Sequence, residues 1–256
     1  MGRIKTSTIA TFRNRFFHYL RRIITAIEHF DLFIQRSRIS PDLYIELNHP
    51  WLTGLNIKTI LDIGAHTGKW AYTVHKLFKG ARIYSFEPIL ESFEALKQRM
   101  SDIANHQAFN VALGDHSGEI EFHVCKFATS SSILPMTQLH KTAFPYSDGS
   151  TSIKVQITRL DDIVEKLEIE HNILIKIDVQ GYEDKVIDGG EQTIKRAKVV
   201  IMEMSFQRLY ENQPLFSDIY DKMIYLGFDY MGNLAQTINP FDGSILQEDA
   251  IFISKS

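Results

Sequence analysis

Two acidic residues and two glycines stand where a protein can hold a nucleotide. Asp62, Gly64 and Gly68 lie at the end of one apolar run, and Glu87 follows the next apolar run along the chain. A strand that passes through a glycine turn into a helix leaves free backbone N–H groups beside a ligand. A carboxylate after the neighbouring strand can accept hydrogen bonds from ribose hydroxyls. The pattern predicts a pocket for a nucleotide cofactor.

The residues around the turn discriminate between cofactors. A dinucleotide fingerprint requires G-x-G-x-x-G, with the pyrophosphate against the turn. Here His66 replaces the middle glycine, and the carboxylate of Asp62 would repel a pyrophosphate. The same carboxylate suits the ammonium group of S-adenosylmethionine, which we therefore favour. The alternatives are an NAD-dependent oxidoreductase, against which the missing middle glycine argues, and a structural glycine turn without a ligand.

A second group of carboxylates follows the later apolar runs. Asp178 ends the run 173–179, Glu183 comes five residues later, and Glu203 ends the run 199–202. Ligands of open α/β sheets bind outside the carboxyl ends of the strands, so Asp178 and Glu203 should face the crevice of Gly64 and Glu87. Methyl transfer to an alcohol needs a base, for which Asp178 is the first candidate and Glu183 and Glu203 are the second.

Other side chains offer alternative chemistry at this edge. The carboxylates can also hold Mg²⁺, although Gln180 supplies no charge to such a site. His66 and His123 are further candidate bases, or structural hydrogen-bonding residues. The segment 125–151 reads as a long loop rich in Ser and Thr, which suits a lid or binding segment. In it Ser130, Ser131 and Ser132 can bind a polar acceptor or the cofactor carboxylate, or simply face solvent.

The elements that must position these residues alternate between strand and helix. Apolar runs and helical periodicity predict a doubly wound α/β domain with a central parallel strand at 173–179. Asn110 and Val111, near the end of the third strand, are expected to meet an adenine. The predicted strands are 59–64, 81–86, 105–113, 119–124, 152–158, 173–179, 199–202, 228–231 and 250–253, and the predicted helices are 68–79, 91–100, 159–167 and 216–226.

Six blocks in order resemble the FkbM-type S-adenosylmethionine-dependent methyltransferases, across residues 57–233. They are Asp62–Gly68, Ser85–Pro88, Ala112–Asp115, Arg159–Asp162, Lys176–Gly181 and Val200–Glu203. The resemblance implies a seven-stranded, mostly parallel class I methyltransferase-like Rossmann fold. It also implies O-methylation of a sugar, glycan or natural-product hydroxyl. The implied cofactor-binding residues are Asp62, Gly64, Ala65, His66, Gly68, Glu87, Pro88, Asn110, Val111 and Asp178, and the implied substrate-binding residues are Ser131, Ser132 and Gln180.

The chain departs from the family pattern at two positions. His66 stands where the family usually has Asn, and Gln180 stands where it usually has Glu. Histidine can also donate a hydrogen bond, so the first change is compatible with cofactor binding. The second removes a candidate base or metal ligand, which leaves open a non-catalytic protein that binds the cofactor or a partner.

Composition limits the other possibilities. The 28 basic and 31 acidic side chains give no sign of a nucleic-acid-binding protein, and the single cysteine, Cys125, excludes an internal disulfide. No run of 18 apolar residues and no secretory signal is visible, so we expect a cytoplasmic protein. We expect an N-terminal helical arm and cap at 1–56 and a methyltransferase domain at 57–256.

The first 40 residues differ in charge from the rest. They hold eight basic and two acidic side chains, a net charge of +6, whereas the remainder is net −9. Six apolar residues recur every three or four positions and predict one helical stripe: Phe16, Leu20, Ile23, Ile27, Phe30 and Ile34. The stripe can dock on the domain, on a second subunit, or on an anionic membrane surface. We expect Ser40-Pro41 to end this helix.

Overall fold

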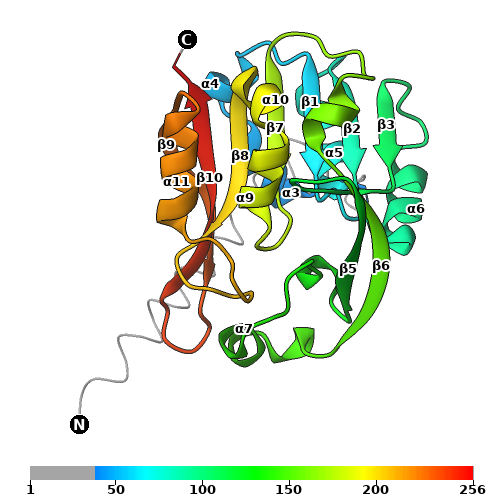
Figure 1. The fold of residues 1–256 in the computed structure, drawn as a ribbon. Helices are drawn as coiled ribbons and strands as arrows, with labels where there is room; N and C mark the ends of the chain where they lie inside the picture. The colour runs from blue at the N-terminus through cyan, green and yellow to red at the C-terminus, as the bar shows by residue number, and fades with distance from the viewer. Residues whose placement is uncertain (1–37, 256) are drawn as a thin grey trace.

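The computed structural model describes residues 38–255 and contains one large sheet with helices on both faces (Figure 1). Its strand order is β3-β2-β1-β7-β8-β10-β9, and β10 is antiparallel to both of its neighbours. The remaining pairs are parallel, as predicted. The strands are β1 (Thr59–Ile63), β2 (Arg82–Phe86), β3 (His106–Phe109), β7 (Ile173–Ile177), β8 (Ala197–Ser205), β9 (Phe228–Ile238) and β10 (Ile245–Ser254).

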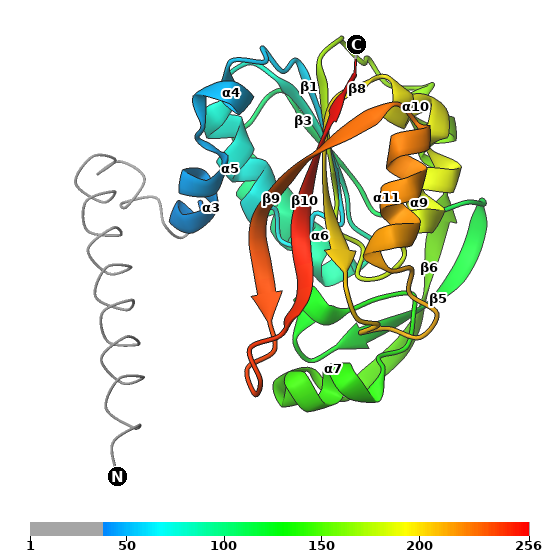
Figure 2. The ribbon, with the colours of Figure 1, turned by 90° about the vertical axis from the view of Figure 1, so that its left-hand side faces the viewer.

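Two sets of helices cover the sheet, one on each face (Figure 2). In the first set, α3 (Pro41–Leu47) and α4 (Pro50–Thr53) precede β1, α5 (Lys69–Leu77) follows β1, and α6 (Leu90–Arg99) follows β2. The other set is α8 (Leu160–Val164), α9 (Glu183–Gly189), α10 (Glu191–Lys195) and α11 (Phe216–Tyr225). Because both faces are covered, the central strands are apolar almost throughout, as the sequence pattern indicated.

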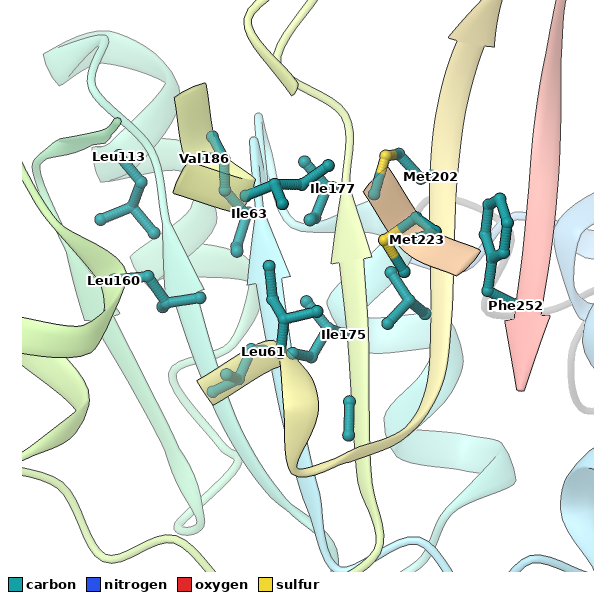
Figure 3. Close-up of a cluster of buried hydrophobic side chains, with 14 of the residues drawn as sticks. Leu61, Ile63, Leu113, Leu160, Ile175, Ile177, Val186, Met202, Met223 and Phe252 are labelled. Atoms are coloured by element: carbon teal, nitrogen blue, oxygen red, sulfur yellow. The ribbon is translucent and has the colours of Figure 1, made fainter. Parts of the chain in front are cut away.

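Side-chain alternation along β7 separates the two cores. Ile173, Ile175 and Ile177 face the α9 and α11 side, whereas Leu174 faces the α5 side. Figure 3 shows Ile175 and Ile177 beside Leu61 and Ile63 of β1, within the first of these cores. By the same alternation, Lys176 and Asp178 lie on the α5 face. Lys176 therefore leaves the sheet on the face opposite to Ile175 and Ile177.

Ile175→Val should cost about 1 kcal/mol of unfolding free energy, because Ile175 is fully buried and the lost methylene leaves a small cavity. Denaturant unfolding measures this cost. The control is Ile153→Val on β6, where the side chain is exposed and the change should be close to zero. Equal midpoints for Ile175→Val and the unmodified protein would contradict this packing.

A smaller sheet lies beyond the carboxyl ends of the large one (Figure 1). Its order is β4 (Ala112–Leu113), β6 (Ser150–Thr158) and β5 (Gly118–Cys125). The predicted strand 105–113 is therefore divided, since β3 pairs in the large sheet and β4 in the small one. The predicted long loop 125–151 contains α7 (Gln138–Ala143) and the short 3₁₀ turns η1 (Ala128–Ser130) and η2 (Pro145–Ser147). This insertion forms a wall opposite the strand ends.

The N-terminal prediction needs one correction. Ser40 begins helix α3, because its hydroxyl accepts the N–H of Leu43 and Pro41 occupies the first turn, where a missing N–H costs nothing. The apolar stripe from Phe16 to Ile34 lies outside the described residues. Between residues 38 and 255, every helix is too short or too polar to cross a membrane.

Candidate active site

The turn between β1 and α5 brings backbone from three elements together. Gly64 adopts φ 79°, and its N–H and that of Ala65 both donate to the carbonyl of Phe86 at the end of β2. A Cβ on Gly64 would overlap the carbonyl oxygen of Asp178. Only glycine allows both this left-handed conformation and this close approach. The turn thereby places the ends of β1, β2 and β7 around one crevice.

Glu87 is held in this crevice by the turn. Its Oε2 accepts the N–H of His66 at 2.8 Å, and its Oε1 accepts the N–H of Ile89 at 2.9 Å. Burial raises the pKa of Glu87 to about 7, although both hydrogen bonds oppose the rise. The Asn110 side chain donates to the carbonyl oxygens of Glu87 and Pro88, so it fixes the loop from behind. Each carboxylate oxygen keeps acceptor capacity for a ligand.

The first cavity, which we call the Glu87 cavity, contains most of the predicted cofactor residues. Most of its lining residues are apolar, and the carboxylates of Glu87 and Asp178 are among the polar ones. The predicted residues that line it are Gly64, His66, Glu87, Pro88, Val111, Ser131, Asp178 and Gln180. Phe86, Leu113 and Phe122 complete the apolar part. A flat, largely apolar ring with a hydroxylated sugar attached matches this combination.

The second cavity, which we call the Lys176 cavity, lies on the α5 face and is strongly acidic. Asp249 on β10 stands directly opposite Glu203 on β8, and both line the cavity together with Glu46 and Asp178. Burial raises the pKa of Asp249 to about 6. Ala65, His66, Lys69, Trp70 and Lys176 are among the other lining residues. The cavity therefore presents carboxylates and ammonium groups side by side, which suits a ligand that carries both charges.

Lys176 is one of the residues that the sequence analysis did not select. Its Nζ lies 3.0 Å from Oδ2 of Asp178 and 4.0 Å from Oδ1 of Asp62. Burial would lower the pKa of Lys176, but Asp178 and Asp62 raise it above its ordinary value. A lysine inside an otherwise apolar strand was the available signal, since a buried charge requires partners.

Asp62 lies beneath the turn and not in the crevice. It is 0% exposed, and neither carboxylate oxygen has a hydrogen-bond partner among the described residues. Burial raises its pKa to about 6, and Lys176 opposes the rise. Asp62 lines neither of the two cavities above. Its predicted contact with a cofactor ammonium group stays a prediction, and its observed charged neighbour is Lys176.

Gln180 joins the two carboxylates at the ends of β7 and β8. Its Nε2 donates to Oδ1 of Asp178 and to Oε2 of Glu203, both at 2.8 Å, and its Oε1 accepts the hydroxyl of Tyr210 at 2.8 Å. Burial would raise the pKa of Asp178, but Lys176 and Gln180 lower it below its ordinary value. Burial and the charge of Asp178 raise the pKa of Glu203 well above its ordinary value. The two carboxyl groups therefore differ in acidity, and Asp178 is the more acidic of the two.

Glu183 has a different environment from the other carboxylates. It is buried, and its Oε1 accepts the N–H groups of Val179 and Gly181, so it supports the loop that carries Asp178 and Gln180. It lines neither the Glu87 cavity nor the Lys176 cavity. Burial raises its pKa to about 7.

Glu183→Gln should stabilise the protein increasingly as pH rises. Folding raises the pKa of Glu183 from about 4.5 to about 7, so the native state binds the proton more tightly than the unfolded state. The protonated side chain therefore stabilises the fold fully below about pH 4.5, and this stabilisation is lost as the pH rises through about 7. The free energy of unfolding of Glu183→Gln, relative to that of the unmodified protein, should rise by roughly 2–3 kcal/mol between about pH 5 and about pH 8.5. Urea unfolding at several pH values measures it. The exposed Glu211→Gln is the control, and parallel pH curves for Glu183→Gln and the unmodified protein would contradict the prediction.

The serine segment contributes mainly to loop structure. Ser132 Oγ donates to the carbonyl of Gln180 at 2.6 Å and accepts the N–H of Leu134. Ser131 Oγ accepts the N–H of Cys125, and this residue also lines the Glu87 cavity. His123 exchanges backbone hydrogen bonds with Ser132. These contacts attach the insertion to the loop of Asp178.

A third cavity, which we call the Tyr146 cavity, lies between the insertion and the β9–β10 hairpin. It is lined by Thr129, Ser130, His140, Phe144, Tyr146, Asp178, Gln180, Glu203, Thr237 and Gln247. Thr129 and Asp178 line all three cavities. Asp178 therefore stands at their junction. The sequence analysis did not select Thr129, because nothing in a serine- and threonine-rich loop marks one hydroxyl over its neighbours.

The prediction of a metal site finds no support in the described part of the chain. Between residues 38 and 255 there is no cluster of three or more His, Cys, Asp or Glu side chains arranged to hold a metal ion. The amide of Gln180 lies within hydrogen-bonding distance of both Asp178 and Glu203 instead.

Comparison with known proteins decides the family. Residues 62–230 match the model of the methyltransferase FkbM domain. The chain belongs to this family. The matched span runs from Asp62 to Tyr230, and so includes the β1 turn, Glu87, Lys176 and Glu203. The order of the large sheet, with one reversed strand next to its edge, is that of the class I methyltransferase fold.

Two relatives and one solved structure illustrate the similarity. The 2-O-methyltransferase NoeI of Sinorhizobium fredii is 33% identical over 170 residues, which are 63% of this chain and 69% of the relative. The hexuronic acid methyltransferase AglP of Haloferax volcanii is 27% identical over 145 residues, 56% of this chain and 54% of the relative. A crystal structure of methyltransferase FkbM from Methylobacillus flagellatus shares 15% identity, with a TM-score of 0.47 over 84% of this chain and 50% of that one. The chain spans about half the length of AglP.

Proposed function

We propose that this protein is an S-adenosylmethionine-dependent O-methyltransferase that acts on a hydroxyl group of a sugar, glycan or natural product. The observation that carries the proposal is the position of Glu87. Its carboxylate follows β2, is fixed by the N–H groups of His66 and Ile89, and faces the cavity at the Gly64 turn. A buried carboxylate at this place suits the hydroxyl pair of a ribose.

The residues present fit this cofactor in its separate parts. Phe86, Val111 and Phe122 offer apolar surface to an adenine, and Glu87 offers acceptors to the ribose. The Lys176 cavity offers carboxylates to an ammonium group, while Lys69 offers positive charge to a carboxylate. The described cavities thus supply groups for the apolar, hydroxylated and zwitterionic parts of one molecule.

The cofactor would supply an electrophilic methyl group on a sulfonium, so the protein has to align the acceptor and accept its proton. Asp178 lies at the junction of the three cavities and is ionised, because Lys176 and Gln180 lower its pKa. We assign to Asp178 the orientation of the acceptor hydroxyl and the acceptance of its proton. His66 is the second candidate, since burial lowers its pKa and keeps the imidazole neutral.

The relatives support the two halves of the proposal separately. NoeI is named as a 2-O-methyltransferase, which supports transfer to oxygen. AglP is named as a hexuronic acid methyltransferase, which supports a carbohydrate acceptor. The rival idea of a non-catalytic protein depended on Gln180, whose amide donates to both Asp178 and Glu203 and so belongs to the proposed site.

A thermal-shift comparison tests the proposal first. S-adenosylhomocysteine should raise the melting temperature, whereas NAD⁺ and buffer alone should not. Transfer of a labelled methyl group from S-adenosylmethionine to a panel of glycosides then tests activity. A shift with NAD⁺ alone would favour an oxidoreductase. A shift with S-adenosylhomocysteine without transfer to any hydroxylated acceptor would favour a cofactor-binding protein without activity.

A further inference from the structure

The Tyr146 cavity has a wall of aromatic rings that the cofactor does not need. Tyr146 is 61% exposed, and its ring contacts Phe127 edge-on, with 5.1 Å between centroids, and Phe144 at 6.1 Å. Phe127 is itself exposed. Exposed aromatic side chains that gather at a cavity mark a binding surface, and their faces suit the C–H groups of a sugar ring. Tyr146 and Phe144 line the same cavity as Asp178, and Phe127 contacts the ring of Tyr146.

The polar groups of this cavity are mostly neutral. Gln180, Thr237 and Gln247 contribute amides and a hydroxyl. His140 is 3% exposed, and its Nδ1 has no hydrogen-bond partner within the described residues. Burial lowers the pKa of His140, so its ring is neutral at pH 7. Neutral donors and acceptors beside an aromatic wall match a ligand with several hydroxyl groups.

The charged side chains of the cavity are of one sign. Asp178 and Glu203 line it, and among residues 38–255 no lysine or arginine does. Lys176 is paired with Asp178 and lines the Lys176 cavity instead. A carboxylate brought into the Tyr146 cavity would lose its hydration, gain no counter-ion and lie near a negative charge.

We infer that the Tyr146 cavity binds the acceptor, and that this acceptor is an uncharged pyranoside and not a uronic acid. The inference rests on the proposed function and goes beyond it, since it names the acceptor site and its charge. The expected acceptor therefore differs from the hexuronic acid in the name of AglP.

Binding of matched sugars to the protein saturated with S-adenosylhomocysteine tests the inference. The probes are the methyl glycosides of glucose, galactose and mannose, each paired with the analogue that carries a 6-carboxylate. At least one neutral glycoside should bind, and at least tenfold more tightly than its acidic partner, by calorimetry or saturation-transfer NMR. Tyr146→Ala should weaken this binding at least tenfold and leave the affinity for S-adenosylhomocysteine unchanged. Tyr225→Ala, an exposed tyrosine on α11, is the control.

A gain of function tests the charge argument separately. Thr237 lines the cavity from β9, so Thr237→Lys should increase the affinity for the acidic glycosides at least tenfold. Thr237→Met, of similar length without the charge, should not.

Two outcomes overturn the inference alone: equal or tighter binding of the acidic partner, or no binding of any glycoside to a protein that binds S-adenosylhomocysteine. Failure to bind S-adenosylhomocysteine overturns the proposed function and the inference with it.

Discussion

Asp178→Ala is expected to lower kcat by at least about 100-fold, within the range that general acid–base residues contribute. Its affinity for S-adenosylhomocysteine should stay within about threefold, because a ribose acceptor and an apolar lining remain in the Glu87 cavity. We expect this loss of kcat because Asp178 lies where all three cavities meet. Steady-state transfer of labelled methyl groups measures kcat, and calorimetry measures the affinity.

Two further variants separate catalysis from folding. Asp178→Asn keeps the shape and can still bond to the side chain of Gln180, so it should preserve the fold while losing most of the activity. Asp221→Ala, an exposed residue of α11, should change neither quantity. Loss of S-adenosylhomocysteine binding in Asp178→Ala, with normal turnover per bound enzyme, would show that Asp178 binds the cofactor and does not act on the acceptor.

Glu87→Ala is expected to weaken S-adenosylhomocysteine binding about 100-fold or more. Hydrogen bonds to charged groups contribute about 1.5–3 kcal/mol each, and the carboxylate would accept two of them from a ribose. The variant also frees the N–H groups of His66 and Ile89, so the turn around Gly64 should lose order. Calorimetric titration with S-adenosylhomocysteine is the measurement.

The comparison with Glu87→Gln shows how much of the loss comes from the charge. This variant keeps one strong acceptor oxygen, and we expect it to lose roughly tenfold in affinity. Glu91→Ala on α6, four residues away and exposed, should bind as tightly as the unmodified protein. An unchanged dissociation constant for Glu87→Ala would remove the observation on which the proposed function depends.

The sequence by itself determined the sheet and the edge of the sheet at which the candidate site lies. Apolar runs such as 173–177 identify buried strands because each strand must exclude water on both faces. Gly64 and Gly68 identify the turn because their left-handed conformations exclude most side chains. Glu87 and Asp178 followed from the rule that parallel strands end at one edge. All of these are properties of short segments, which periodicity and residue type can reveal.

Only the tertiary structure decided which polar groups meet. Asp249 comes opposite Glu203 through strand pairing, Gln180 joins Asp178 to Glu203, and Lys176 reaches Asp62 on another strand. The insertion likewise brings Tyr146 into the lining of one cavity with Asp178. These contacts join residues far apart in the chain, and their geometry depends on register and on packing between layers. Local sequence patterns carry no record of either, so the charge of each cavity could be determined only in the folded molecule.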